Sequence, residues 1–408
     1  MSNQRNKCNI IWTNKNLYMN YLKTIFIIIS LTLLSGCVSP YYPNITKYEN
    51  TLVVDGEITN LPGPYIIRLS KSFSFEEKIG TPVSNATVKI IDNTGLEIQL
   101  KENSDNKGEY ITTDTTFRGV VGNSYKLQIK AEDEIYESEF QILKKPIPID
   151  KVYWEYIPQT NVNPRSVQLL LDTHDPDNNT HYYKWEYEET WKFWAPISVV
   201  LKPELKECYK YTTSSTFNIN TTILRHNDNI ERQSLLYINE NTNRLYSRYS
   251  MLVKQSAISE EAYKFFDELV RFNQNQGTLF DPIPYTLVGN IKSKTNKDIP
   301  ILGYFLVSGT TEKRIFIDRT ELPAEYNPTS GFNDCNLRTV FVSKKLTDYR
   351  KNPTVDSLIF NGYQVYETFD PHDPRDPDKL GLNLAKPICY NCTLQGDNKV
   401  PSFWTEKK

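Results

Sequence analysis

The residue with the most specific chemistry in this sequence is Cys37, which directly follows Leu34, Ser35 and Gly36. A short apolar run, then small residues, then cysteine is the pattern of a bacterial lipobox, in which the thiol receives a diacylglyceryl group and the chain is cut before the cysteine. We therefore expect residues 1–36 to be a signal peptide and Cys37 to be the lipidated N-terminus of the mature chain. The alternative is a signal that is cleaved without lipidation.

The apolar run before Cys37 is interrupted by Ser30 and Thr32 and is preceded by Lys23. A helix that crosses a bilayer needs about 20 apolar residues, so this run is predicted to be a signal segment rather than a membrane span. Residues 1–18 are interpreted as an over-long start, because Met19 and the lysine after it would begin an ordinary signal. Residues 37–50 are polar and contain prolines, and are predicted to be a tether.

Four further cysteines follow Cys37 in the mature chain: Cys208, Cys335, Cys389 and Cys392. An even number of cysteines in an exported chain indicates disulfides, although the sequence leaves all three pairings open. The C-x-x-C spacing of the last two allows each to reach a distant partner. Zinc binding is the alternative, disfavoured because no histidine lies near this motif. A thioredoxin-like redox site is disfavoured because no strand-then-helix pattern surrounds it.

An acidic stretch from Asp172 to Asn179 carries carboxylates and amides that could ligate calcium in a loop between strands. Its spacing does not match a helix-loop-helix calcium site, and Asp, Asn and Pro are also the usual turn formers. A solvated turn is therefore the preferred interpretation, and we assign no metal and no cofactor. Residues 369–379, where aspartate and proline alternate with other polar residues, are predicted to be an exposed loop.

Motifs for covalent catalysis are missing from the sequence. Ser308 and Gly309 lack the first glycine of a Gly-x-Ser-x-Gly elbow, and no glycine-rich phosphate loop is present. We therefore assign no catalytic residue. The 49 acidic residues contain many candidate pairs for glycoside hydrolysis, but their separations are not encoded in an obvious pattern.

Aromatic residues make up 12% of the chain and gather in residues 182–194. Alternate members, Tyr183, Trp185 and Tyr187, are predicted to fill a sheet core. Trp191 and Trp194 lie beyond the predicted strand, which ends near residue 188, and are our candidates for a binding surface, since tryptophan stacks on sugars and anchors interfaces.

The elements that would position these residues are mainly strands. Residues 51–146 contain five to seven short β-rich runs at the spacing of an immunoglobulin-like or prealbumin-like β-sandwich. Prolines in residues 144–150 predict a boundary, and residues 147–408 are predicted to form a larger β-rich domain with one amphipathic helix. That helix spans residues 259–274, with Ser259 as N-cap and an apolar stripe of Ala262, Phe265, Phe266, Leu269 and Phe272. A net charge of −2 disfavours nucleic acid as a partner.

Several segments together resemble one family. They are residues 52–60, 110, 122–125, 148–150, 182–186, 289–291, 302–305, 389–393 and 401–404. In these segments the chain resembles the Bacteroidota lipoproteins grouped as domain of unknown function 4249. The resemblance implies an outer-membrane lipoprotein whose gene commonly lies beside that of a TonB-dependent receptor. The family has no established enzymatic activity that the resemblance could assign to this chain.

We therefore expect a non-enzymatic lipoprotein of the outer membrane, an accessory or ligand-binding partner of a TonB-dependent receptor in nutrient uptake. The alternative is a surface hydrolase acting on glycan or peptide, and a third hypothesis is a purely structural envelope protein. Residues 38–42 lack the acidic residues that often mark surface-displayed lipoproteins of this phylum. Both faces of the outer membrane therefore stay open, and the sequence does not identify the ligand.

Overall fold

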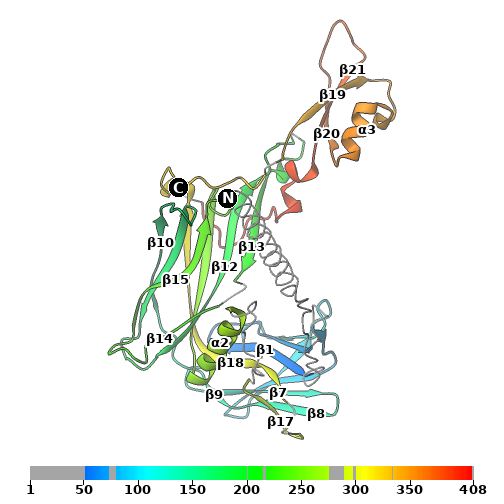
Figure 1. The fold of residues 1–408 in the computed structure, drawn as a ribbon. Coiled ribbons are helices and arrows are strands. Elements are labelled where there is room, and N and C mark those ends of the chain that lie inside the picture. The colour runs from blue at the N-terminus through cyan, green and yellow to red at the C-terminus, as the bar shows by residue number, and fades with distance from the viewer. Residues whose placement is uncertain are drawn as a thin grey trace, which may run out of the picture. The chain divides into compact units, whose positions relative to one another are not determined.

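Strands whose side chains alternate between a core and solvent account for most of this protein, whose structure is a computed structural model (Figure 1). The structure describes residues 51–72, 80–199, 201–214, 217–274, 289–296, 300–332 and 334–406. The fold is mainly β, as the sequence predicts. Signal peptide, Cys37 and tether lie outside the described residues. No helix within the described ranges is long and apolar enough to span a membrane.

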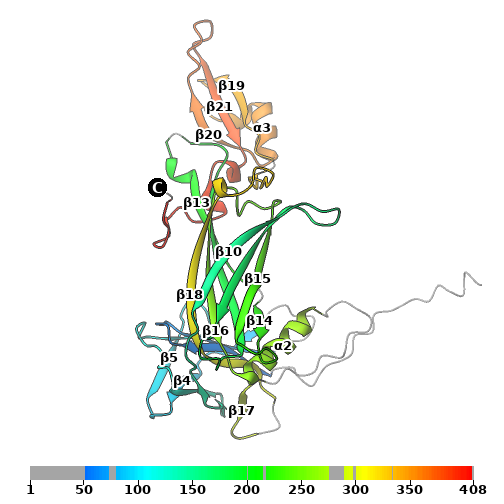
Figure 2. The ribbon, with the colours of Figure 1, turned by 90° about the vertical axis from the view of Figure 1, so that its left-hand side faces the viewer.

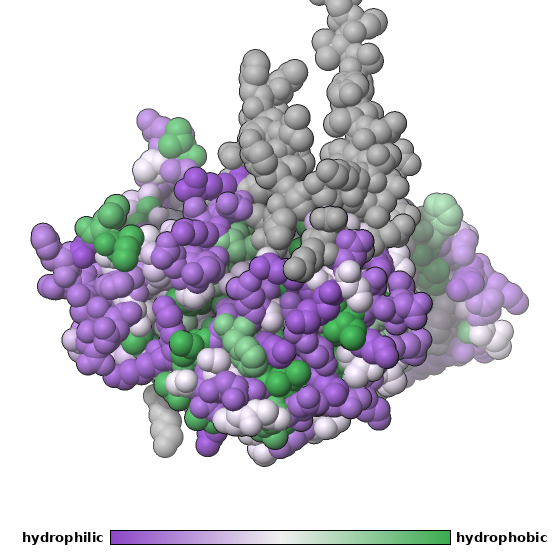
Figure 3. All heavy atoms as spheres, turned by 90° about the horizontal axis from the view of Figure 1, so that it is seen from below, coloured by the Kyte–Doolittle hydropathy of each residue, from purple (hydrophilic) through white to green (hydrophobic). Residues whose placement is uncertain are grey.

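The N-terminal strands follow the predicted alternation. They are β1 (Leu52–Thr59), β2 (Ile66–Lys71), β3 (Thr81–Pro82), β4 (Thr87–Asp92), β5 (Glu97–Glu102), β6 (Glu109–Thr112), β7 (Ser124–Ala131), β8 (Glu134–Ser138) and β9 (Gln141–Ile142). In β7, for example, Tyr125, Leu127 and Ile129 are buried while the residues between them are not. Buried side chains of these strands share one sandwich-like core. Seen from below, the surface is largely hydrophilic, with small separate hydrophobic areas (Figure 3).

One strand, β18 (Leu302–Asp318), belongs to two parts of the sheet. Its first half pairs in parallel with β1, from Val53 opposite Leu302 to Thr59 opposite Ser308. Its second half pairs antiparallel with β16 (Arg248–Ala257). A single continuous strand of 17 residues thus belongs to both parts of the sheet. A short strand, β17 (Ile291–Ser293), pairs with β8 at the far edge.

The larger region is a two-layered β arrangement. One layer is β10 (Ile149–Ile157), β11 (Ser166–His174) and β15 (Asn229–Asn239), and the other contains β12 (Tyr182–Trp194), β13 (Glu207–Thr213), β14 (Asn218–Thr221), β16 and the second half of β18. Figure 2 shows these long strands side by side. Tyr183, Trp185 and Tyr187 are buried between the layers, as predicted. The Trp185 indole N–H donates to Gln255 Oε1 at 2.8 Å, and the Gln255 amide donates to Thr173 Oγ1 at 2.9 Å.

Helix α2 (Glu260–Gln274) confirms the predicted amphipathic helix. Ser259 accepts a hydrogen bond from the backbone N–H of Ala262 at 3.1 Å, which caps the helix. The helix packs Ala262, Phe265 and Phe266 against side chains of β18 such as Tyr304. The side chain of Phe272 lies outside the described residues.

The last part of the chain forms a small α/β unit, which we call the C-terminal module (residues 338–385). It contains β19 (Arg338–Ser343), helix α3 (Pro353–Phe360), β20 (Gln364–Phe369) and β21 (Lys379–Ala385), with β21 in the middle of the sheet. Buried Val355 of α3 packs against Val342, Leu382 and Leu384. The sequence prediction of a single helix missed α3, which Asn352 caps by accepting from two backbone N–H groups. Between β20 and β21 the chain makes the predicted loop, most of it exposed.

Two disulfides involve the segments that flank this module. Cys335 bonds to Cys389 and closes the chain around the module, whereas Cys208 of β13 bonds to Cys392. Each cysteine of the C-x-x-C motif thus reaches a distant partner, which confirms the disulfide prediction and selects one of its three pairings. Short 3-10 helices occur at η2 (Pro203–Leu205), η3 (Arg319–Glu321), η4 (Tyr349–Lys351), η5 (Pro387–Cys389) and η6 (Cys392–Leu394).

The predicted division of the chain at residue 146 stays a prediction. The N-terminal core contains buried side chains from Leu52 to Leu143 and also some from later strands, such as Ile291, whereas the core between the two layers contains side chains from Ile147 onward. Strand β18 contributes to both cores: Phe305 to the first and Ile317 to the second. Residues 50–408 group as one unit by their contacts.

Candidate functional site

The strands that bury the aromatic core carry charged residues on their other face. In β12, Tyr183, Trp185 and Tyr187 point into the core, so Lys184 and Glu186 between them lie on the other face of the sheet, where Lys184 is buried beside Phe266 of α2. The cross-strand register continues this pattern across β16, β18 and β1. We call the following residues the charged face: Glu57, Lys184, Glu186, Glu188, Lys192, Arg248, Lys254, Glu312, Arg314 and Asp318.

Most charges on the charged face are paired with an opposite charge. Lys184 Nζ lies 2.7 Å from Glu186 Oε2, and Lys254 Nζ lies 2.6 Å from Glu188 Oε1. Lys254 Nζ also lies 3.9 Å from Glu312 Oε1 on the next strand. Burial alone would lower the pKa of Lys254, but the hydrogen bond that Lys254 donates to Glu188 and the nearby carboxylates raise this pKa above its ordinary value. These side chains therefore form a fixed pattern of alternating charge.

Two members of this face show no ion pair within the described residues: Arg314, which donates to the Ser250 hydroxyl at 3.0 Å, and Glu57. Burial raises the pKa of the Glu57 carboxyl, and the charge of Glu186 raises it further, while Lys184 and Lys254 act in the opposite direction. Within the described residues Glu57 shows no ion pair, because both lysines are bonded to other carboxylates. An acid whose pKa is raised by its surroundings is a candidate for proton transfer or for receiving a cationic group.

Aromatic side chains border the charged face at both ends. At the α2 end, Lys184 Nζ lies 5.0 Å from the ring centre of Phe266. At the other end, the guanidinium of Arg314 lies 3.6 Å from the ring centre of Phe403, and Trp404 packs edge-on against Phe316 at 5.7 Å. The C-terminal tail is thus held on this sheet by cation–π and aromatic contacts.

The two tryptophans predicted as surface binding residues have different positions. Strand β12 continues to residue 194, so the prediction that they lie beyond the strand is wrong. Trp191 is 5% exposed, packs in the core and donates to Asn243 Oδ1, because it shares the face of Tyr187. Trp194 lies on the opposite side, partly exposed, and donates to Glu207 Oε2 at 2.9 Å. Only Trp194 adjoins the charged face.

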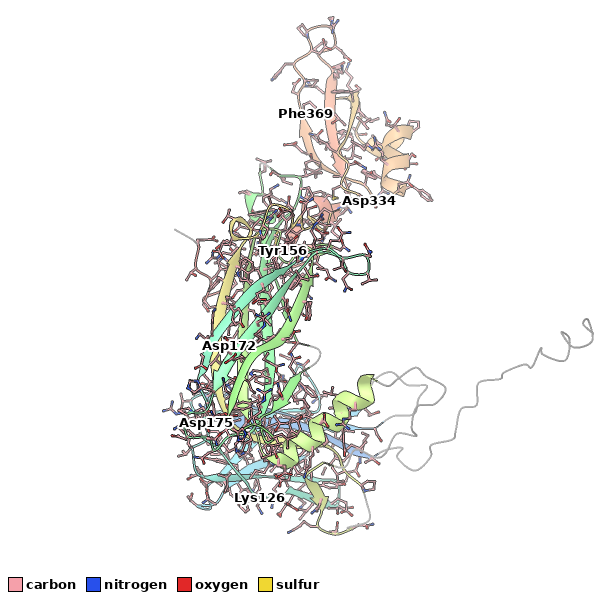
Figure 4. The ribbon with its side chains drawn as sticks, turned by 60° about the vertical axis from the view of Figure 1, so that its left-hand side comes forward. Lys126, Tyr156, Asp172, Asp175, Asp334 and Phe369 are labelled. Carbon is pink, nitrogen blue, oxygen red and sulfur yellow. A yellow bond between two sulfur atoms is a disulfide. The ribbon has the colours of Figure 1, made fainter. Side chains whose placement is uncertain are left out.

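The acidic stretch considered for calcium is used for local structure. Asp172 lies within β11 and accepts from the Tyr153 hydroxyl, while Asp175 lies in the following turn (Figure 4). Burial alone would raise the pKa of Asp175, but backbone N–H groups of Asn179, Asp177 and Thr180 hold it below its ordinary value. These hydrogen bonds are those of a tight turn, the preferred prediction.

A cavity of about 410 Å³ opens beside that turn, lined in part by His174, Asn178 and Asp228. Asp228 is buried and accepts from the hydroxyls of Tyr183 and Thr222. In the part of the chain that the structure describes, no three His, Cys, Asp or Glu side chains converge as metal ligands.

Most residues of the charged face were missed at the sequence level. The alternation of Lys184, Glu186 and Glu188 within an aromatic strand was a usable signal, because it marks one polar face. The positions of Glu57 and Arg314 beside them depend on pairings between strands far apart in the chain, which no local pattern encodes.

The family model described as Domain of unknown function (DUF4249) matches residues 38–314 of the chain. This range begins directly after Cys37 and includes the charged face up to Arg314. The C-terminal module and the last two segments that carried the sequence resemblance lie beyond it. A search of curated proteins returned no match.

Proposed function

Because the chain belongs to the family Domain of unknown function (DUF4249), we propose that it is a lipid-anchored, non-enzymatic protein of the outer membrane that binds a TonB-dependent receptor as an accessory in nutrient uptake. The family match from residue 38 onward fits a mature chain that starts at Cys37. The partner follows from the genes that commonly accompany this family, and either face of the membrane is compatible with the proposal.

The observation that carries the proposal is the fixed alternation of charge on the charged face. Electrostatic complementarity between surfaces directs specific association, because a matching pattern attracts the correct partner and repels others. Carboxylates held within 2.7 Å of lysines by ion pairs are poorly suited to act as free catalytic acids or bases, but they are well suited to orient a charged partner surface.

The proposal is tested by affinity purification from solubilised outer membranes of cells that carry a C-terminally tagged protein, with Cys37→Ala as the unanchored control. We expect stoichiometric recovery of a TonB-dependent receptor. Lys254→Glu reverses the central charge of the face and should abolish recovery. Lys345→Glu is the matched control, because Lys345 forms an ion pair of similar length, 2.7 Å to Asp378, on the C-terminal module. Recovery of the tagged protein alone would contradict the proposal.

Glu57 favours a second candidate function, a surface hydrolase acting on glycan or peptide. Its raised pKa suits a general acid, which is the role of one of the two carboxylates in glycoside hydrolysis. A screen of envelope glycans and peptides with wild-type protein and Glu57→Gln decides this. Turnover that disappears in Glu57→Gln would replace the accessory function by the hydrolase, and absence of turnover would remove the hydrolase.

A further inference from the structure

The sheet of the C-terminal module has one face that α3 does not cover. Val342, Leu382 and Leu384 point toward α3, so the residues between them point away from it. We call these residues the module's outer face: Thr339, Phe341, Glu367, Phe369, Lys379, Gly381 and Asn383. Figure 4 locates Phe369 in this module. The whole face lies beyond the family match, which ends at residue 314.

Two aromatic rings occupy the centre of the module's outer face. Phe341 and Phe369 stand opposite Gly381 from its two neighbouring strands, and their ring centres are 6.2 Å apart. A Cβ on Gly381 would lie 2.4 Å from two ring carbons of Phe369, so the ring lies across the middle strand where only glycine leaves room. Phe341 is 48% exposed and Phe369 36%. Both rings therefore offer apolar surface to solvent from a rigid sheet.

A row of polar side chains lies beside the two rings on the same face, at the next set of residues paired across the three strands. The Thr339 hydroxyl donates to Asn383 Oδ1 at 2.8 Å, and the Asn383 amide donates to Glu367 Oε2 at 2.9 Å. These bonds fix the three side chains but leave a second amide N–H, the other carboxylate oxygen and the hydroxyl oxygen available for further hydrogen bonds. The row thus presents both donors and acceptors beside the rings.

The charges around the rings are nearly balanced. Lys379 lies 4.5 Å from the ring centre of Phe341 and 3.5 Å from Asp373, and Lys344 lies 2.6 Å from Asp370. Glu367 shows no ion pair within the described residues. A polyanion would meet the unpaired carboxylate, whereas an uncharged ligand with many hydroxyl groups would complement both the rings and the polar row.

We propose that the module's outer face binds a neutral saccharide chain, with the rings stacking on the apolar face of a sugar and the polar row bonding to its hydroxyl groups. This inference deepens the proposed function, because it names a class of ligand for the accessory protein. It rests on the proposed function in one respect: the saccharide is bound and not hydrolysed. The module would hold the ligand while the charged face holds the receptor.

The test is isothermal titration calorimetry of the whole mature protein with maltohexaose, cellohexaose and mannohexaose. We expect at least one hexasaccharide to bind, and Phe369→Ala to weaken its affinity about tenfold or more. Gly381→Ala keeps both rings but displaces Phe369, and should weaken binding similarly. Phe360→Ala is the matched control, because Phe360 is 91% exposed on α3 of the same module but lies away from the outer face.

Binding of no hexasaccharide at millimolar concentration would overturn the inference, as would equal affinities of Phe369→Ala and Phe360→Ala. Thermal melting of each variant separates lost binding from lost folding. The receptor purification, repeated with Phe369→Ala, separates the two proposals. Recovery of the receptor without saccharide binding refutes only this inference, and saccharide binding without recovery of the receptor refutes only the accessory function.

Discussion

We predict that removal of each disulfide has a different effect on unfolding, although Cys389 of one bond and Cys392 of the other lie only three residues apart. Removal of the bond between Cys208 and Cys392 frees a loop whose ends are 184 residues apart, and removal of the bond between Cys335 and Cys389 frees one of 54. We expect the double alanine variant of the first pair to destabilise the two-layered region. The double alanine variant of the second pair should destabilise the C-terminal module alone.

Loop-closure entropy gives the magnitudes. The chain-entropy relation assigns about 5 kcal/mol to the longer loop and about 4 kcal/mol to the shorter one at 25 °C. The shorter loop lies inside the longer one, but the dependence on length is logarithmic, so the presence of one bond changes the other value little. These are upper values, since an unfolded chain with residual structure reduces them.

Urea unfolding followed by two signals separates the effects. Residues 338–385 contain no tryptophan, so tryptophan fluorescence reports the rest of the chain, whereas far-UV circular dichroism reports the module as well. Loss of the Cys208 bond should lower the stability measured by fluorescence. Loss of the Cys335 bond should leave the midpoint of the fluorescence transition unchanged. In circular dichroism, unfolding of the module should then appear as a separate first step at lower urea concentration. Two results would refute the independent unfolding of the module: a fluorescence shift caused by loss of the Cys335 bond rather than the Cys208 bond, or identical unfolding curves for the two variants.

Three further predictions concern the charged face and the core. Burial raises the pKa of the Glu57 carboxyl in the folded protein above its ordinary value of 4.5. The contribution of Glu57 to stability is therefore fully present below pH 4.5 and is lost as the pH rises through the folded-state pKa. Glu57→Gln should raise the melting temperature by a few degrees at pH 7 but not at pH 4, and equal shifts at the two pH values would contradict this. Trp185→Ala should destabilise the protein by about 3–5 kcal/mol in urea unfolding, because it opens the core and leaves Gln255 without its donor, and a loss below about 1 kcal/mol would be inconsistent with that packing. Asp228→Ala removes the acceptor of the buried Thr222 hydroxyl and leaves the buried Tyr183 hydroxyl with only the Thr180 carbonyl oxygen, at 3.5 Å. This change should cost roughly 3 kcal/mol by the same measurement, and an unchanged unfolding midpoint would contradict it.

Much of the fold follows from patterns that are local in the sequence. Alternation in residues 124–131 predicts a half-buried strand, and Ser259 before a glutamate pair predicts the start of α2. Helix α3 also carries a usable signal, since Asn352 followed by Pro353 is a common helix start. Its eight residues are short enough to be taken for a loop.

What the sequence analysis missed depends on contacts between distant residues. Polar Ser308 and Thr310 interrupt two apolar runs and indicate a loop, yet both are buried where β18 passes from one core to the other. Between them, a Cβ on Gly309 would lie 2.2 Å from the carbonyl oxygen of Lys144, so the strand continues only because this residue has no side chain.

Prediction of the candidate sites failed for a related reason. The predicted strand ends near residue 188, but Glu189 is buried and accepts from the Tyr249 hydroxyl at 2.8 Å, and β12 continues to Trp194, so Trp191 enters the core. The module's outer face joins three strands that each contribute two or three residues, and no single segment shows the pattern.

The parallel pairing of β1 and β18 has a mechanical consequence. A lipid anchor would precede β1, and the C-terminal module follows β18, so tension between membrane and module would pull the two strands in opposite directions along their length. The seven residue pairs from Val53–Leu302 to Thr59–Ser308 would then resist as a group in shear. Strands pulled apart from one end lose their hydrogen bonds one at a time. This geometry is therefore expected to withstand a force transmitted between an anchored N-terminus and a bound ligand.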